Sequence, residues 1–354
     1  MTHCETRERD EATSRGGRDS SSPHWRVESG GTGCAAIRAV RVFVIGGTGV
    51  IGSRVLQRLI ARGHEVSALS RSEANRQVVE GAGAKAVAAN VADSSALAAA
   101  LRGHEVVVNL ATHIPPSSRA FLPGAWRATN ELRRTLPPRI ARAAAEAGVR
   151  TYVQESFAPA YPDCGDRLID ESTPIATVRY NRGIADAEAA TFAFTSADRR
   201  GIVLRFAYFY GSDSDFTRDM IATVRKGWAP APGAPEAYMS SVSHDDAADA
   251  VVAALSLPAG AYNVTDDEPV TRRQFVDSLA DRLGVPHPRF APAWIWRLLG
   301  SLGETLSRSQ RMSNGKLRDA SDWRPRYPSV REGWAAVVRG EPNRTAPNPI
   351  ASSE

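Results

Sequence analysis

The sequence predicts an α/β protein built on a doubly wound parallel sheet. From residue 40 onward, short runs rich in β-branched residues alternate with longer segments rich in alanine and arginine. This alternation is typical of right-handed β-α-β units, which place their strands in parallel. The run HEVVVNLA (104–111) is almost continuously apolar, as expected of a strand that helices cover on both faces.

The individual elements follow from hydrophobic periodicity and from helix-capping residues. Strands are expected at 39–45, 64–71, 84–91, 104–111, 149–156, 201–211 and 261–266, and helices at 52–63, from Asp93 or Ser94 onward, at about 126–147, near 180–195 and at 271–284. Gly63 closes the first helix, and Thr271 is the expected N-cap of the last. Pro137 and Pro138 are expected to bend or break the helix at 126–147, because proline lacks the N–H group that a helix interior uses.

The composition is that of a globular protein with a sizeable core. The chain of 354 residues is 42% hydrophobic and 23% charged, and no apolar run reaches the length of about 18 residues that a membrane span needs. The net charge is +5, but the arginines that dominate it are spread along the chain, which favours solvated surface charge over a nucleic-acid interface. Cys4, Cys34 and Cys164 lack metal-ligand spacing. We therefore expect a cytoplasmic protein that binds neither nucleic acid, membrane nor metal.

A glycine-rich turn separates the first strand from the first helix. In GGTGVIG (46–52) glycines recur every third residue, at 46, 49 and 52. Gly46 begins a tight turn that calls for a positive φ, Gly49 lets the helix N-terminus approach a pyrophosphate, and Gly52 permits close packing of helix on strand. The N–H groups and dipole of that helix end attract an anion. The strand-turn-helix context predicts a Rossmann-type dinucleotide site.

The end of the second strand indicates which dinucleotide binds. Chains of this topology that use NAD tend to place Asp or Glu there, which binds the ribose 2′-hydroxyl. This chain has Ser70, Arg71 and Ser72, with Arg76 one helical turn later. A guanidinium pairs bidentately with a phosphate. The segment therefore predicts NADP as the cofactor, with NAD as the alternative; the structural alternative is that Arg71 is an ordinary surface residue.

Three segments beyond the glycine turn carry a family resemblance. They are NLAT (109–112), LRFAYFYG (204–211) and SVSHDDAADAVVAAL (241–255). Together with the turn, they resemble the extended short-chain dehydrogenase/reductase superfamily, and within it the NAD-dependent epimerase/dehydratase family, over roughly residues 40–335. Phe206 stands where that family usually has proline. The resemblance implies a small-molecule substrate and a homodimer as the default assembly.

The glycine turn, the strand ends and the resemblance together define the expected cofactor site. Its residues are Gly46, Thr48, Gly49, Val50, Ile51, Gly52, Ser70, Arg71, Asn90, Val91, Leu110, Ala111 and Thr112.

The chain then divides into four expected regions. Residues 1–38 form a disordered tail, because they lack hydrophobic periodicity. Residues 39–211, with additions from about 241–266, form the NAD(P)-binding Rossmann domain. A smaller, intertwined substrate-binding region covers 212–335, and 336–354 is a frayed C-terminal tail.

Chemistry in the superfamily rests on a Tyr-x-x-x-Lys pair and an upstream Ser or Thr. The resemblance assigns these roles to Tyr180, in RYNRGIADAEAA, and to Ser156, in TYVQES. Four residues after the tyrosine stands Ile184 instead of lysine, and none of the three lysines lies nearby in sequence. Without a cation, a phenol with a pKa of about 10 is almost entirely protonated at pH 7.

Several interpretations follow from the isoleucine. An arginine from elsewhere in the fold takes the place of the lysine, Tyr180 acts as a neutral acid, or another group, such as Tyr161, supplies the proton. Tyr180 and Ser156 each also have a purely structural interpretation as packing residues.

Two smaller groups of polar residues are weighed beside this site. His244, Asp245 and Asp246 are expected to begin a helix, with an aspartate as its N-cap, rather than to bind a metal. Arg308 and Arg311 are candidates for contact with an anionic substrate.

Two classes of function are therefore expected. The first is an NAD(P)-dependent oxidoreductase or epimerase/dehydratase-like enzyme that acts on a carbonyl or secondary alcohol of a sugar or small metabolite. The second is a non-catalytic NADP(H)-binding redox sensor or scaffold protein, in which the absent lysine reflects an absence of turnover.

Overall fold

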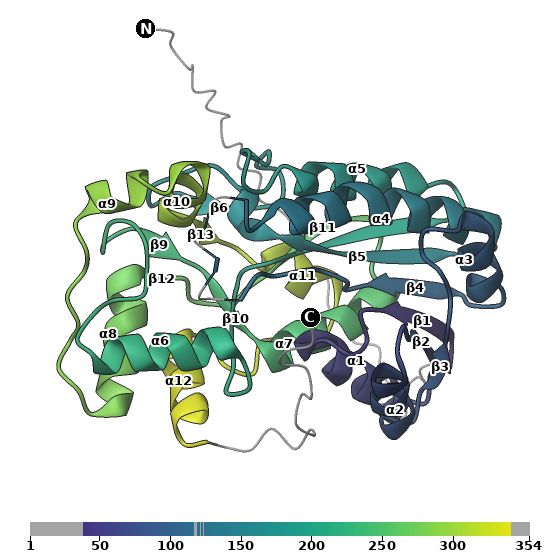
Figure 1. The fold of residues 1–354 in the computed structure, drawn as a ribbon, viewed down its shortest axis with the longest axis horizontal. Helices are drawn as coiled ribbons and strands as arrows, with labels where there is room; N and C mark the ends of the chain where they lie inside the picture. The colour runs from purple at the N-terminus through teal and green to yellow at the C-terminus, as the bar shows by residue number, and fades with distance from the viewer. Residues whose placement is uncertain (1–37, 117–118, 121, 123, 341–354) are drawn as a thin grey trace, which may run out of the picture. The chain divides into compact units, whose positions relative to one another are not determined.

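A seven-stranded parallel sheet forms the centre of the computed structural model, which describes residues 38–116, 119–120, 122 and 124–340 (Figure 1). The strand order is β11-β7-β5-β4-β1-β2-β3, and all neighbouring pairs are parallel. This is the order of a doubly wound Rossmann sheet, with its reversal between β1 and β4. The predicted fold class is confirmed.

The strands of this sheet fall within or next to the apolar runs of the sequence. They are β1 (Arg41–Ile45), β2 (Glu65–Leu69), β3 (Lys85–Val87), β4 (Val106–Asn109), β5 (Thr151–Phe157), β7 (Arg200–Phe206) and β11 (Gly260–Val264). The helices between them are α1 (Val50–Ala61), α2 (Glu73–Gly81), α3 (Ser94–Leu101), α4 (Arg127–Glu146), α5 (Gly183–Phe194) and α7 (His244–Ala253).

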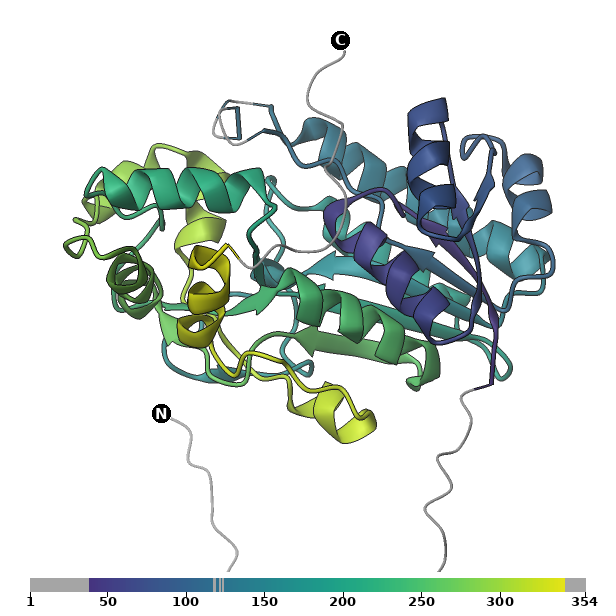
Figure 2. The same cartoon turned by 90° about the horizontal axis from the view of Figure 1, so that it is seen from below.

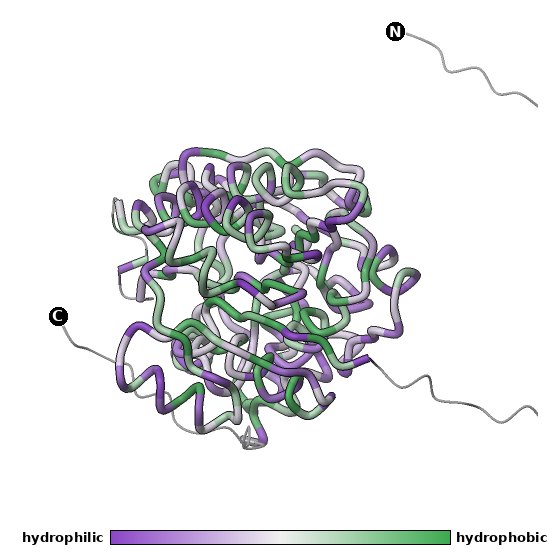
Figure 3. The backbone as a smooth tube through the Cα atoms, turned by 90° about the vertical axis from the view of Figure 1, so that its right-hand side faces the viewer, coloured by the Kyte–Doolittle hydropathy of each residue, from purple (hydrophilic) through white to green (hydrophobic). Residues whose placement is uncertain are grey.

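Helices cover both faces of the sheet (Figures 1 and 2). Successive side chains of a strand point to opposite faces, and β1 shows the consequence. Val42 and Val44 belong to a buried cluster with residues of α1 and α7, whereas Phe43 and Ile45 belong to a cluster with residues of α3 and α4. Hydrophobic segments accordingly run through the middle of the chain trace, and hydrophilic ones gather along its edges (Figure 3). Both faces of the central strands are therefore core.

The segments after β7, together with β6, add small two-stranded sheets and a third buried cluster. The short strands are β6 (Leu168–Ile169), β8 (Tyr208–Tyr210), β9 (Tyr238–Met239), β10 (Ser241–Ser243), β12 (Val270–Thr271) and β13 (Arg311–Met312), and the remaining helices are α6 (Asp215–Arg225), α8 (Arg272–Leu283), α9 (Ala293–Arg297), α10 (Gly300–Ser307), α11 (Gly315–Ala320) and α12 (Val330–Val338). Two short 3₁₀ helices, η1 (Ala158–Ala160) and η2 (Ala254–Ser256), follow β5 and α7. Trp334 of α12 is buried against Phe275 of α8 and Tyr210.

Parts of the predicted tails lie outside the described residues. Of the expected N-terminal tail at 1–38, only residue 38 is described, and of the expected C-terminal tail at 336–354, residues 336–340 are. The last helix, α12, continues to Val338. Within the described part of the chain, no helix is both long and apolar enough to cross a membrane.

Two local expectations are corrected by the structure. Pro137 and Pro138 do not break α4, which is one helix of 20 residues; the burial of its apolar face, including Leu136 and Ile140, outweighs the missing hydrogen bonds. The N-cap of α7 is not an aspartate but Ser243, whose Oγ accepts from the N–H of Asp246 at 3.1 Å. The expected caps Asp93 and Thr271 are confirmed.

The proline pair generates a stability prediction. Pro138→Ala should raise the free energy of unfolding by about 1 kcal/mol or more, because alanine restores an N–H donor inside α4 and removes the steric conflict with the preceding turn. Urea denaturation followed by circular dichroism measures it. Arg142→Ala, an exposed change on the same helix, should alter stability by less than about 0.5 kcal/mol. Destabilisation by Pro138→Ala would show that the helix requires the proline.

Candidate functional site

Close packing fixes the glycine turn between β1 and α1. Gly46 has φ 87°, and a Cβ added there would lie 2.7 Å from the backbone N of Ala111 and the carbonyl C of Leu110. A Cβ at Gly52 would overlap with the carbonyl oxygen of Gly46. The turn therefore presses against both the end of β4 and the first turn of α1, so larger residues at 46 and 52 are excluded.

Gly49 differs, because space is open in front of it. Its added Cβ would meet only the Gly46 oxygen, at 3.5 Å, and its φ of −75° suits any residue. It is the N-cap of α1, yet the helix has neither a side-chain cap nor an acidic residue in its first turn. Side chains cap α2, α3 and α7, whereas α4 and α5, like α1, begin without a side-chain cap. The first N–H groups of α1 thus fit the phosphates of a dinucleotide.

The end of β2 presents one arginine that has no partner. The Ser70 hydroxyl is buried and donates to the carbonyl oxygen of Ser72 at 3.0 Å, which shapes the turn into α2. Arg71 is exposed and forms no ion pair or hydrogen bond among the described residues. Arg76, in contrast, pairs with Glu73 and Glu80 on its own helix. Of the two arginines, only Arg71 is free to meet a ligand phosphate.

The remaining predicted cofactor residues lie at the carboxyl ends of neighbouring strands. Thr48, Val50 and Ile51 are partly exposed in the turn and the first turn of α1, Leu110, Ala111 and Thr112 follow β4, and Asn90 and Val91 follow β3. The side-chain oxygen Oδ1 of Asn90 accepts a hydrogen bond from the N–H of Ala92 at 3.0 Å. Carboxyl ends of adjacent parallel strands share one edge of the sheet, where open α/β sheets bind ligands.

An ion-pair network attaches α1 to the C-terminal half of the sheet. Arg54 donates to the carbonyl oxygen of Val50 at 2.8 Å and to Asp213 at 2.8 Å, and Asp213 also contacts His244 of α7 at 3.0 Å. Burial alone would raise the pKa of Asp213, but the hydrogen bonds from His244 and Arg54 outweigh it and hold the pKa well below its usual range. His244 is therefore a member of this network through its contact with Asp213.

Ser156 lies in a buried polar network that crosses three strands. It is in register with Arg205 of β7, which is in register with Asn263 of β11. The Ser156 hydroxyl donates to Glu188 of α5 at 2.7 Å, and Arg205 donates to both oxygens of Glu188, at 3.0 and 2.7 Å. The predicted hydroxyl is thus engaged with a carboxylate.

Tyr161 belongs to the same network. Its hydroxyl accepts from Arg205 at 2.7 Å and donates to Asn263 at 2.8 Å. Burial raises its pKa to about 12, against the opposing charge of Arg205. The hydroxyl of Tyr161 therefore has two protein partners, and the residue is fully buried from solvent.

Tyr180 lies just before α5, at the same edge of the sheet as the glycine turn. It is 9% exposed, its ring packs edge-on against Trp126 with centroids 4.9 Å apart, and its carbonyl oxygen accepts from Asn130 at 2.7 Å. Its hydroxyl has no hydrogen-bond partner within the described ranges. Burial raises its pKa well above the usual value, the ionised form of Tyr208 would raise it further, and Arg133 opposes both effects.

The cation near Tyr180 is already neutralised. Ile184, four residues after Tyr180, is 1% exposed. The cation that acts on Tyr180 is Arg133 of α4, which donates to Glu155 at 2.6 Å inside the protein. A paired arginine offers a phenolate little net charge.

Tyr208 is a further phenol at this edge, besides the predicted Tyr180 and Tyr161. Tyr208 begins β8, two residues after the end of β7, and its ring packs edge-on against Phe157 at the end of β5, with centroids 5.8 Å apart. The signal was its place in LRFAYFYG, shortly after the end of a central strand, where binding residues of open sheets lie.

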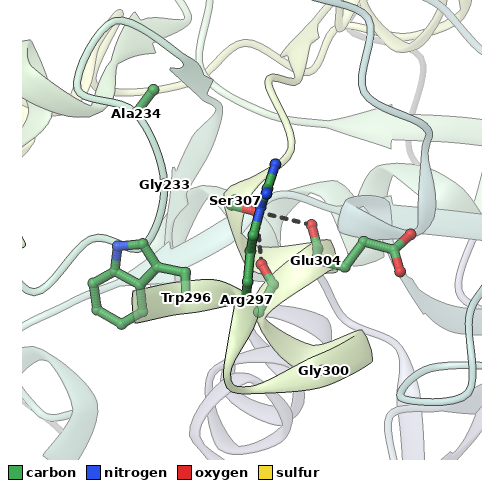
Figure 4. Close-up of a pocket in the computed structure, with 8 residues that line it drawn as sticks. Gly233, Ala234, Trp296, Arg297, Gly300, Glu304 and Ser307 are labelled. Atoms are coloured by element: carbon green, nitrogen blue, oxygen red, sulfur yellow. Dashed lines mark hydrogen bonds between the residues drawn. The ribbon is translucent and has the colours of Figure 1, made fainter. Parts of the chain in front are cut away.

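The C-terminal region contains a cavity of about 380 Å³ between the 233–234 loop and helices α9 and α10 (Figure 4). Trp296 and Arg297 reach it from α9, and Glu304 and Ser307 from α10. Arg297 has no partner among the described residues, whereas Glu304 pairs with Arg308 at 3.0 Å.

The two predicted anion-binding arginines are both engaged. Arg308 donates to the carbonyl oxygens of Tyr161 and Ala176, at 3.0 and 2.8 Å, besides its pair with Glu304. Arg311 stacks over the ring of Tyr238, 5.2 Å from its centroid.

Comparison with known proteins gives these features a family. The model of the NAD dependent epimerase/dehydratase family matches residues 42–265. The chain belongs to this family. The cofactor class is accordingly a nicotinamide dinucleotide, which suits the glycine turn and the uncapped N-terminus of α1. The function is of the NAD(P)-dependent oxidoreductase or epimerase type.

Several relatives accompany the family match. The chain is 34% identical over 311 residues, 83% of its length and 99% of the relative's, to 3-diazoavenalumate denitrifying reductase from a Streptomyces species. It is 28% identical over 282 residues, 76% of its length and 81% of the relative's, to 4-hydroxy-2-methyl-3-oxo-4-farnesyl-3,4-dihydroquinoline-1-oxide ketoreductase from Stigmatella aurantiaca. The human epimerase family protein SDR39U1, solved with NADPH, shares the fold with TM-score 0.72 and 21% identity, over 84% of this chain and 99% of the human one.

Gly49 gives this family site a direct test. Gly49→Ala should weaken NADPH binding by about tenfold or more, because the added methyl projects where phosphate approaches, while the melting temperature stays within about 2 °C. Isothermal titration calorimetry and thermal melts separate the two effects. Gly81→Ala, a helix-end glycine with open space around its Cβ, is the matched control. Equal NADPH affinity in the wild type and Gly49→Ala would place the phosphates elsewhere.

Proposed function

We propose that the protein is an NADPH-dependent reductase of a carbonyl group or a comparable electrophile in a small metabolite. The observation that carries this proposal is the state of the site's two phenols. Burial raises the pKa of Tyr180 above its ordinary value and that of Tyr208 to about 12, and the lysine that lowers such a pKa is replaced by the buried Ile184. The site thus has acids at neutral pH and lacks a phenolate base.

Reduction and oxidation place opposite demands on such a site. Bound NADPH supplies a hydride. A protonated phenol then supplies the proton that a reduced carbonyl oxygen takes up, whereas oxidation of an alcohol needs a group that removes a proton. A phenol that keeps its proton at pH 7 suits the first task. The names of two relatives, a denitrifying reductase and a ketoreductase, agree with this direction.

The choice of NADPH over NADH rests on Arg71. The end of β2 carries no acidic residue to bind a ribose 2′-hydroxyl, and the guanidinium of Arg71 is exposed without a partner among the described residues. The N–H groups at the start of α1 would hold the pyrophosphate, and Arg71 the 2′-phosphate.

The second candidate is a non-catalytic NADPH-binding protein. Two observations favour it: the residue four positions after Tyr180 is the buried Ile184, and the Ser156 hydroxyl is bound to Glu188. NADPH oxidation with carbonyl substrates separates the two candidates, because a sensor or scaffold binds the cofactor without consuming it.

Arg71 provides the cofactor test. Arg71→Gln should weaken NADPH binding by about tenfold or more, since a charge-assisted contact with phosphate is worth about 1.5–3 kcal/mol. The affinity for NADH should change by less than about twofold, because NADH lacks the 2′-phosphate. Fluorescence titration with both cofactors measures it. Arg76→Gln, whose arginine is paired with Glu73 and Glu80, is the control, and an equal loss for both cofactors in Arg71→Gln would contradict the assignment.

The raised phenol pKa values generate a pH prediction. Because both phenols stay protonated below their raised pKa values, kcat for carbonyl reduction should change by less than about twofold between pH 7 and 9. The rate of alcohol oxidation should rise by about tenfold per pH unit over the same range, since the phenolate fraction rises tenfold per unit below the pKa. Steady-state assays in both directions measure it. A tenfold fall in reduction between pH 7 and 9 would indicate a proton donor with a neutral pKa.

A further inference from the structure

A buried arginine in the C-terminal region lacks a carboxylate partner. Arg272, the first residue of α8, is 1% exposed. Its Nη2 donates to the carbonyl oxygens of Leu306 and Arg308, both at 2.7 Å, and its Nε and Nη1 are buried with no hydrogen-bond partner among the described residues. Burial lowers its pKa, but a guanidinium remains protonated in proteins. Carbonyl groups cancel no charge, so a positive charge remains in the interior.

Tyr208 lies across one strand segment from Arg272. The segment 237–240 runs between them: the N–H of Arg272 donates to the carbonyl oxygen of Ala237 at 2.9 Å, and the N–H of Tyr208 donates to that of Ser240 at 3.1 Å. The Tyr208 side chain is partly exposed beyond the end of β7, beside Phe157, and its hydroxyl has no partner in the described part of the chain. A partly exposed phenol and a buried cation thus flank the same segment of the chain.

The charges that act on Tyr208 are few. Burial raises its pKa, and Arg272 and then Arg308 oppose that rise. Arg308 is paired with Glu304 at 3.0 Å, which reduces its net effect. Tyr180 is the other titratable group that interacts with Tyr208, and the charge of Asp163 acts on Arg272 from outside hydrogen-bond distance. The uncompensated charge near Tyr208 is therefore that of Arg272.

We propose that Tyr208 is the proton donor of the reaction and that Arg272 is a positioning residue, whose buried charge takes over the electrostatic role of the lysine absent at position 184. This inference rests on the proposed reductase function. As the carbonyl carbon accepts the hydride, the π-electron pair moves to the carbonyl oxygen. The O–H bond of Tyr208 breaks and its proton bonds to that oxygen. The phenolate that remains is stabilised by Arg272 and takes a proton from water.

Tyr180 lacks this advantage. The cation that acts on it, Arg133, is neutralised by Glu155 at 2.6 Å. Of two phenols at one edge of the sheet, the one beside an uncompensated cation is the stronger acid, and a stronger acid transfers its proton faster.

A spectroscopic experiment tests the charge effect without any substrate. 3-Nitrotyrosine placed at position 208, or in a second protein at position 180, reports its ionisation by absorbance within the stable pH range. The pKa at 208 should be the lower of the two. Arg272→Gln should raise the pKa at 208 by about one pH unit and that at 180 by less, which is the effect of one charge removed nearby.

The adjacent arginine provides a matched control. Arg273→Gln removes the same charge one residue away, but Arg273 is paired with Glu236 at 3.1 Å, so the pKa at 208 should stay constant. The order of the two pKa values in otherwise wild-type protein tests the proposal even if Arg272→Gln does not fold. A higher pKa at 208 than at 180, or no response to Arg272→Gln in folded protein, overturns the role of Arg272.

Kinetics with NADPH and phenanthrenequinone, as a carbonyl probe, test the role of Tyr208. Tyr208→Phe should lower kcat by about tenfold or more with unchanged NADPH affinity, and Tyr180→Phe should lower it by less. The reverse order overturns this inference and leaves the reductase function intact. A wild-type protein that binds NADPH but oxidises it with no carbonyl probe overturns the proposed function, and the proton-donor role with it.

Discussion

The approach of Gly46 to the end of β4 is the constraint on which the rest of the site depends. With φ 87° and no side chain, Gly46 lets the chain turn out of β1 against the backbone of Leu110 and Ala111. Gly52 then lets α1 begin directly on that turn. The helix end consequently meets the edge where β1, β2 and β4 finish, with its N–H groups uncapped. A side chain at either glycine would separate the helix from the edge and remove the phosphate site.

At β5, β7 and β11, a buried network of hydrogen bonds and one ion pair stabilises the same edge of the sheet. Ser156, Arg205 and Asn263 are in register on β5, β7 and β11, and Glu188 of α5 completes the network. Each of these four residues has a hydrogen-bond partner within the network, although Nδ2 of Asn263 has none among the described residues. The removal of one member therefore leaves another unsatisfied, at a cost of about 1–3 kcal/mol or more. Ser156, which the sequence predicted as a catalytic hydroxyl, thus has a structural use in this chain.

Local sequence predicted the sheet because its signals are local. Each signal lies within a few residues of the chain: an apolar run, a helix cap such as Asp93, or a glycine that a tight turn requires. The continuity of α4 was not predictable in this way, because it depends on what packs against Leu136 and Ile140. The bond between Ser156 and Glu188 depends on how α5 packs against β5. The placement of Tyr208 and Arg272 on either side of residues 237–240 depends on three segments far apart in sequence. Contacts between such distant segments produce no periodic pattern in the sequence from which they could be predicted.

The absent lysine then has a different meaning in the folded chain. In the sequence, Ile184 stands where the Tyr-x-x-x-Lys motif would have its lysine, which raises the question of whether the protein is catalytically active. In the fold, Ile184 is buried and the arginine that acts on Tyr180 is paired with Glu155. The buried Arg272, which has no carboxylate partner among the described residues, and Tyr208 flank the same segment, 237–240. The electrostatic requirement is for a positive charge near a phenol at the edge of the sheet, and nothing in that requirement specifies which helix provides it. Reduction relaxes the requirement further, because its phenol needs only to lose a proton to a stronger base.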